Sequence, residues 1–192
     1  HGCFDPLFLP ALPGYTVLCP ASFAELRHML KTALFELAGP VAVRYPRGGE
    51  GTYRSDKSDK PLVRLREGRG VTLLTYGVLV NQALEAAERL EKRGIEAEVL
   101  KLNQIAPLNG EVLADFFQET DILLVLEDCF GAGCAGQRIA AILAGEGRAP
   151  QKLILKNLGR TFVPEGSVPQ LEERFGLDAA AVAEAVEEAC HE

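Results

Sequence analysis

Arg47 is the first candidate for chemistry because of the residues that surround it. Val41–Val43 form a short run of β-branched and small apolar residues that is typical of a strand, and Pro46 stops ladder pairing just beyond it. Arg47 therefore lies just past the carboxyl end of a strand, next to the flexible pair Gly48-Gly49. Ligands of open α/β sheets bind at that edge. A guanidinium there suits a phosphate or a carboxylate, because its planar donors match two oxygens at once. The alternative is a solvated surface arginine beside a turn.

A second candidate is the run from Gly131 to Gly136, which has the GxGxxG spacing of a dinucleotide-binding loop. It follows an apolar strand and opens a helix, as that motif requires. However, Glu127 and Asp128 directly precede it and would repel a pyrophosphate. The next strand ends in Leu155 to Leu158, without the acidic residue that binds a ribose. These departures favour the alternative that the glycines let the helix pack close to the sheet or to a neighbouring domain.

Cysteine and histidine residues give no metal or redox motif. The five cysteines are odd in number and scattered, so we interpret them as reduced cytosolic thiols, located at Cys3, Cys19, Cys129, Cys134 and Cys190. Cys129 and Cys134 are too far apart for a CxxC pair. No pair among the three histidines has metal-ligand spacing, so we predict no metal site. His28 is predicted to be solvated.

Composition excludes several classes of protein. The 192 residues carry a net charge of -7 and no Lys/Arg run, which argues against a nucleic-acid partner. No apolar run approaches the ~20 residues that a membrane helix needs. No signal peptide is visible, so we predict a cytoplasmic protein. The first residue is His1 rather than Met, and apolar sequence follows at once, which suggests a chain that is cut inside a domain.

Two α/β units are expected to position these residues. In the first, a strand at 15–20 and the strand at 41–45 flank a helix that Ser22 and Glu25 open as a capping box. Apolar residues at helical spacing should form the buried face of this helix, namely Phe23, Leu26, Leu30, Ala33, Leu34 and Leu37. Residues 51–69 are predicted to be a linker, in which Leu62, Val63 and Leu65 could add an edge strand. Strands alternate with helices from 70 to 192, which predicts a mostly parallel sheet covered on both faces.

The order of these pieces resembles the carboxy-terminal third of the 1-deoxy-D-xylulose-5-phosphate synthases, a thiamine diphosphate-dependent family of the transketolase superfamily. The resemblance runs almost from end to end, and its most specific element is Gly39–Gly48. Further matching segments are 1–5, 12–14, 20–22 with 25–27 and 29–30, 107–109, Glu127 with 131–133, 157–159, 162–166 and 176–179. Departures are modest: Arg160-Thr161 stands where the family usually has Pro-Asp, and Asn109 replaces an aspartate.

The resemblance implies how the chain is divided. Residues 1–50 would be the second half of a pyrimidine-binding α/β domain, 51–69 a linker, and 70–192 a complete transketolase C-terminal domain. The intact enzyme would be a homodimer that uses thiamine diphosphate and Mg²⁺. It would condense pyruvate with D-glyceraldehyde 3-phosphate and release CO₂, and its product would feed isoprenoid and thiamine biosynthesis.

By the same resemblance, Arg47 matches the arginine that binds the phosphate of the acceptor substrate. His1 matches the residue before a glycine in a Thr-His-(His or Gln)-Gly stretch, so the catalytic histidine would precede it. No catalytic, cofactor or metal ligand is therefore assigned within the chain, and the fragment alone is expected to be inactive. Three alternatives remain open: half of a transketolase, a 2-oxoacid dehydrogenase β subunit, or a non-catalytic dimerisation module.

Overall fold

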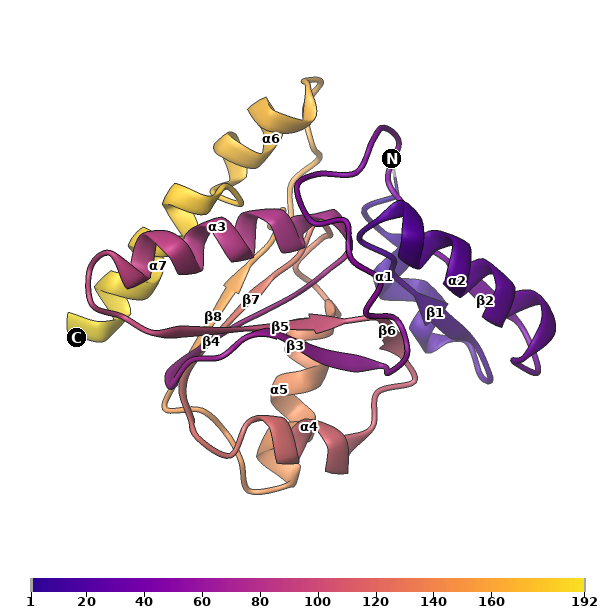
Figure 1. Cartoon of the computed structure of the whole chain (residues 1–192), viewed down its shortest axis with the longest axis horizontal. Helices are drawn as coiled ribbons and strands as arrows, with labels where there is room; N and C mark the ends of the chain where they lie inside the picture. Colours follow the sequence, from indigo (N-terminus) through magenta and orange to yellow (C-terminus); the bar gives the residue numbers. More distant parts are fainter. Residues whose placement is uncertain (1, 192) are drawn as a thin grey trace.

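The computed structural model describes residues 2–191; His1, whose predicted match precedes the family glycine, lies outside the described residues. The chain folds around two sheets (Figure 1). The strands are β1 (Thr16–Leu18), β2 (Val41–Val43), β3 (Leu62–Arg66), β4 (Gly70–Tyr76), β5 (Ala97–Leu102), β6 (Gln104–Ala106), β7 (Thr120–Leu126) and β8 (Lys152–Lys156). The α-helices are α1 (Asp5–Phe8), α2 (Phe23–Phe35), α3 (Val80–Glu91), α4 (Gly110–Phe116), α5 (Ala135–Gly145), α6 (Val168–Phe175) and α7 (Ala179–His191).

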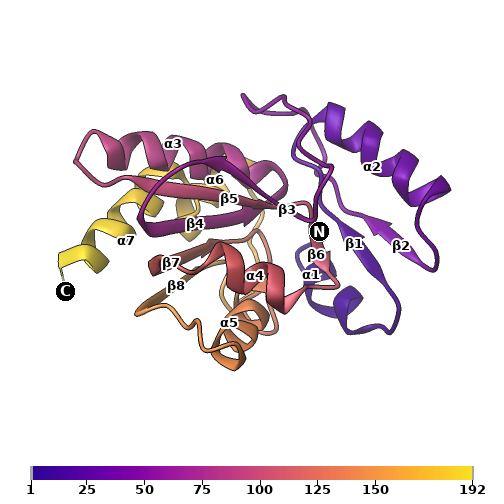
Figure 2. The same cartoon turned by 60° about the horizontal axis from the view of Figure 1, so that its bottom comes forward.

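The larger sheet has the strand order β3-β5-β4-β7-β8, and every neighbouring pair is parallel except β3 with β5. This confirms the predicted α/β class with a mostly parallel sheet. The proposed edge strand at Leu62, Val63 and Leu65 is also confirmed, because β3 pairs at the edge of this sheet. Helices α3 and α7 cover one face, and α4 and α5 lie on the other (Figures 1 and 2).

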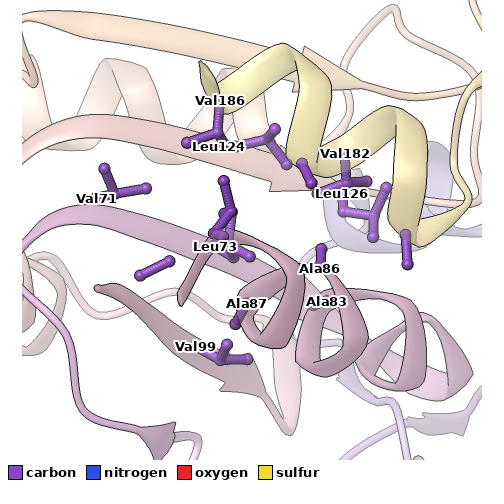
Figure 3. Close-up of a cluster of buried hydrophobic side chains, with 14 of the residues drawn as sticks. Val71, Leu73, Ala83, Ala86, Ala87, Val99, Leu124, Leu126, Val182 and Val186 are labelled. Atoms are coloured by element: carbon purple, nitrogen blue, oxygen red, sulfur yellow. The ribbon is translucent and has the colours of Figure 1, made fainter. Parts of the chain in front are cut away.

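Alternating side chains of the central strands fill both faces of the larger sheet. Val71 and Leu73 of β4 pack toward α3 and α7, whereas Leu74 and Tyr76 belong to the cluster on the opposite face. Figure 3 shows the first cluster, in which small alanines of α3 let the helix lie close to the strands and to α7. Burial on both faces explains why these strands are nearly continuous apolar runs.

The smaller sheet has the order β2-β1-β6. Strands β1 and β2 are parallel, as expected for two strands joined through α2, and β6 pairs with β1 in the antiparallel direction. Strand β6 follows β5 after a single residue and was not predicted from the sequence. β6 follows a strand of the larger sheet along the chain but pairs only in the smaller sheet, so the second half of the chain contributes a strand to the smaller sheet. The domain boundaries at 50 and 70 remain a prediction.

The predicted buried face of α2 is wrong. Phe23 is 54% exposed and Leu34 is 72% exposed, and Leu30 and Leu37 are also exposed. The residues of α2 that are buried are Glu25 and Met29. Leu26 and Ala33 are half-buried, and within the described residues no element covers the rest of the apolar stripe. The Ser22 cap is confirmed, since its hydroxyl accepts from the backbone N–H of Glu25. Glu25 itself does not complete a capping box: its carboxylate accepts from Ala21.

The thiols differ sharply in their exposure, which gives a test of the fold. Cys190 is exposed and Cys3 is half-buried, whereas Cys19, Cys129 and Cys134 are buried. Burial raises the pKa of Cys19 to about 12 and that of Cys134 to about 11, so neither forms the reactive thiolate near pH 8. A thiol reagent such as dithionitrobenzoate should modify Cys190 quickly and Cys3 more slowly, and should reach the other three only after denaturation. Fast modification of more than two thiols in the folded chain would contradict this burial.

Candidate functional site

Arg47 lies in a groove of about 320 Å³ beside the amino-terminal end of α2. We call it the Arg47 groove; its lining residues are 20–23, Leu26, 45–50 and Val78. Arg47 is exposed, and within residues 2–191 its guanidinium has no hydrogen-bond or ion-pair partner. The guanidinium is therefore available to an anion that enters the groove. The predicted location just past the carboxyl end of β2 is confirmed by the bounds of that strand.

Backbone freedom at the turn helps to expose Arg47. Gly48 has a φ of 123°, which side chains rarely allow, and a Cβ built on Gly48 or Gly49 would meet no atom within 4 Å. Glu50 also lines the groove, but its carboxylate accepts from the backbone N–H of Phe23 at 2.7 Å. A carboxylate in that position complements the positive end of the α2 dipole. The groove therefore presents one unpaired cation and a carboxylate that is already bonded.

Arg44, three residues before Arg47, has a different environment, and the sequence analysis did not single it out. Its guanidinium donates to Asp128 at 2.9 Å and lies over the Tyr76 ring, 5.8 Å from the centroid. Burial alone would lower the pKa of Arg44, but the Asp128 carboxylate raises it above its ordinary value. Arg44 thus attaches the end of β2 to the larger sheet. In the sequence, the one signal that Arg44 and Arg47 point in different directions was the alternation of side chains that begins at Arg44 and Tyr45.

Glu127 occupies the place where the GxGxxG loop would have bound a phosphate. Its buried carboxylate accepts from the backbone N–H of Ala135 at 2.9 Å and of Gly136 at 2.8 Å, at the start of α5. The Tyr76 hydroxyl donates to it at 3.1 Å. A Cβ on Gly136 would lie 2.6 Å from Leu155 and 3.0 Å from Glu127. This geometry supports the alternative in which the glycine allows close packing of the helix on the sheet.

A buried ion pair forms where the two units meet. Glu25 of α2 and Lys101 of β5 are both 0% exposed, and their charged atoms are 2.9 Å apart. The Tyr53 hydroxyl donates to the same carboxylate at 2.7 Å, and Lys101 also bonds Asn103. Burial lowers the pKa of Lys101 below its ordinary value, although the nearby Glu25 charge opposes this. From the sequence, Glu25 was predicted to be a helix-capping residue, and this buried cluster was not predicted.

These contacts together close the carboxyl edge of the larger sheet. Tyr76, Lys101, Glu127 and Asp128 lie at or just after the ends of three parallel strands, where open α/β sheets usually bind ligands. Here each of them contacts the preceding unit or the start of α5. Within residues 2–191, no group of three or more His, Cys, Asp or Glu side chains is placed to hold a metal ion. The ligand-accessible edge is instead that of the smaller sheet, at Arg47.

Two other predictions concern the surface. His28 is half-buried rather than fully solvated, because its ring contacts Asp56 at 3.1 Å and the Ser58 hydroxyl at 2.9 Å. Among the described residues, no helix is both long and apolar enough to span a membrane.

The fold and its closed sheet edge define a class of carboxy-terminal α/β domains. The chain belongs to the transketolase C-terminal domain family. The model of this family, described as "Transketolase, C-terminal domain", matches residues 61–182. The curated relatives include 1-deoxy-D-xylulose-5-phosphate synthases. The protein from Chlorobium luteolum is 37% identical over 98% of this chain, and that from Heliobacterium modesticaldum is 38% identical over 98%. The chain spans about 30% of the length of each, corresponding to their carboxy-terminal region.

Solved structures give the same picture. A split-gene transketolase, described as an inactive β4 tetramer, has a TM-score of 0.77 and 29% identity, and the match covers 97% of this chain and 60% of that chain. A transketolase from Pichia stipitis has a TM-score of 0.71 at 20% identity, which shows likeness of fold alone; it covers 93% of this chain and 25% of that one. These curated relatives and solved structures match between 93% and 98% of this chain. The matches therefore extend beyond residues 61–182 and include the smaller sheet and the Arg47 groove.

Proposed function

We propose that the chain is the carboxy-terminal part of a 1-deoxy-D-xylulose-5-phosphate synthase and that Arg47 binds the phosphate of its acceptor substrate. The proposed enzyme condenses pyruvate with D-glyceraldehyde 3-phosphate and releases CO₂. The observation that carries the proposal is the unpaired guanidinium of Arg47 in a groove of about 320 Å³. A phosphate dianion matches its donors, and the apolar walls around it weaken competition from water. The relatives of that name supply the substrate class.

Thiamine diphosphate and Mg²⁺ belong to this proposal through the relatives, but the residues of this chain do not fit them. The buried carboxylates Glu25 and Glu127 and the partly exposed Asp128 are already bonded to protein donors, and the described residues hold no cluster of metal ligands. We therefore assign both cofactors to other parts of the proposed enzyme and expect this chain alone to be inactive. The proposal includes a homodimer in the cytoplasm. It also divides the chain into the second half of a pyrimidine-binding domain (1–50), a linker (51–69) and the C-terminal domain (70–192).

Replacing Arg47 with alanine in the protein that contains this chain should weaken only the acceptor. Loss of charge-assisted hydrogen bonds of about 1.5–3 kcal/mol should raise the apparent KM for D-glyceraldehyde 3-phosphate roughly 10- to 100-fold. The KM for pyruvate should change by less than about twofold, because the phosphate contact is not made to that substrate. Arg47→Lys should lie between, since it keeps the charge and loses the planar donors.

Arg27→Ala is the matched control, because Arg27 is an exposed arginine on α2 outside the groove. An unchanged acceptor KM in Arg47→Ala would refute the assignment of the phosphate site. A transketolase half is the second candidate, favoured by the likeness to the split-gene transketolase. Product analysis separates the two: the synthase consumes pyruvate and forms 1-deoxy-D-xylulose 5-phosphate, whereas a transketolase transfers a two-carbon unit between sugars and needs no pyruvate.

A further inference from the structure

Arg47 is carried by a loop that is attached to the larger unit at its two ends. At the first end, Arg44 has two attachments. Its backbone N–H donates to Leu18 of β1 in the smaller sheet at 2.8 Å. Its side chain binds Asp128 of the larger unit. Asp128 follows β7, 84 residues further along the chain. The start of the loop is therefore held against the carboxyl edge of the larger sheet.

Tyr53 forms the second attachment. Its side chain is buried, with 8% of the residue exposed, and its backbone N–H donates to the Asn81 side chain at 2.8 Å. Its hydroxyl donates to Glu25 at 2.7 Å, and Glu25 is held in turn by Lys101 at 2.9 Å. The Lys101 ammonium also lies over the Tyr53 ring, 5.9 Å from the centroid. Tyr53 is thus fixed by groups from α2, α3 and β5.

Between these attachments the loop has few contacts of its own. Residues 45–49 are exposed, and two of the five are glycines. Within the described residues, the side-chain contacts that hold this stretch before Thr52 and Tyr53 are both made by Glu50, which accepts from the start of α2 and pairs with Arg54 at 3.7 Å. The position of the Arg47 backbone is therefore determined mainly by where the two ends of the loop are held.

We propose that Tyr53 is a positioning residue for Arg47, and that the buried Glu25–Lys101 pair is the support on which it acts. The inference rests on the proposed function, since it concerns the anion that Arg47 binds. Tyr53 does not line the Arg47 groove, so it has no direct contact with a ligand there. Its effect reaches the guanidinium through the five residues of chain between them, 48–52. Misplacement of a binding group by about 1 Å is enough to reduce its contribution strongly.

The test removes one hydroxyl, by Tyr53→Phe in the full protein that contains this chain. The apparent KM for D-glyceraldehyde 3-phosphate should rise about three- to tenfold, while kcat and the KM for pyruvate stay within about twofold. Tyr15→Phe is the matched control, because it makes the same chemical change at a residue outside both the groove and the network. Amide hydrogen exchange at Tyr53 and Lys57, whose N–H groups donate to Asn81 and Glu25, should become faster in Tyr53→Phe and stay unchanged in Tyr15→Phe.

A double variant separates positioning from a general loss of stability. If Tyr53 acts through Arg47, adding Tyr53→Phe to Arg47→Ala should leave the acceptor KM where Arg47→Ala put it. A further rise of the same size, or no change in Tyr53→Phe alone, would overturn the proposal. If Arg47→Ala itself leaves the acceptor KM unchanged, the proposed function fails instead. Should Tyr53→Phe not fold, Asn81→Ala loosens the same attachment from α3 and is judged by the same outcomes.

Discussion

Lys101→Met should lower the free energy of unfolding of the chain by about 3–5 kcal/mol, although methionine is apolar and similar in length. Lys101 is fully buried, and so is its partner Glu25, whose charged atom lies 2.9 Å away. The substitution leaves the Glu25 carboxylate buried without its counter-ion. Hydrogen bonds from Tyr53 and Ala21 remain, but they do not replace the lost cation. Urea denaturation followed by circular dichroism measures the difference.

The double variant Lys101→Met with Glu25→Gln should recover a large part of this loss. A glutamine amide can accept from Ala21 and donate to the Tyr53 oxygen, so the site is then neutral and keeps two of its hydrogen bonds, whereas the Lys57 N–H loses its acceptor. Lys31→Met is the control, because Lys31 is an exposed residue of α2, and its effect should stay within about 0.5 kcal/mol. A single Lys101→Met variant as stable as the parent chain would show that the pair carries no such energy. If the double variant is no more stable than Lys101→Met, the unpaired charge is not the cause of the loss.

The same ion pair shows where prediction from the sequence ended. The apolar runs at 71–75 and 122–126 predict strands, and the structure has β4 and β7 there. A strand that is buried on both faces needs apolar residues at successive positions, and this pattern is visible in the local sequence. Lys101 lies inside such a run, and nothing near it in the sequence identifies its partner 76 residues earlier. Arg44 and Asp128 are 84 residues apart and pose the same problem. Local patterns reveal elements, whereas charge pairs between units depend on how the units dock.

Helix α2 shows the opposite difficulty. Its apolar spacing is real, but a stripe predicts only that some surface will cover it, not that this chain supplies that surface. The residues that docking buries on α2 are Glu25 and Met29. Strand β6 was missed because its three residues carry no alternation of their own and pair only with β1. The prediction of Arg47 as a binding residue uses a signal that is local: a strand, a proline and two glycines.

Closure of the larger sheet explains why the GxGxxG spacing and the proposed phosphate site lie in different places. Glu127 and Asp128 follow the central strand β7 and turn its carboxyl end into an attachment point for α5 and for Arg44. The positive end of α5 is neutralised by a residue of the same chain. What remains available for an anion is the carboxyl end of β2, where Arg47 has no such partner among residues 2–191.

Glu127→Ala should therefore be strongly destabilising rather than opening a nucleotide site. The substitution removes the acceptor of two buried backbone N–H groups, Ala135 and Gly136, and of the Tyr76 hydroxyl. Each of the two backbone donors left unpaired costs about 1–3 kcal/mol, whereas the Tyr76 hydroxyl can still donate to Cys129 Sγ at 3.5 Å. The free energy of unfolding should therefore fall by roughly 2–6 kcal/mol. Glu127→Gln keeps the volume and one accepting oxygen, and its loss should be about half as large. Urea titrations of both variants measure these differences.

Glu119→Ala is the matched control, because Glu119 is an exposed glutamate just before β7, and its effect should stay within about 0.5 kcal/mol. Amide hydrogen exchange adds a local measure: protection of Ala135 and Gly136 should fall in Glu127→Ala more than protection of residues in the middle of α5. Unchanged stability together with unchanged protection would mean that these N–H groups do not depend on the carboxylate. The start of α5 would then be free to bind an anion. Glu127 would no longer explain why the glycine loop and the proposed phosphate site lie in different places.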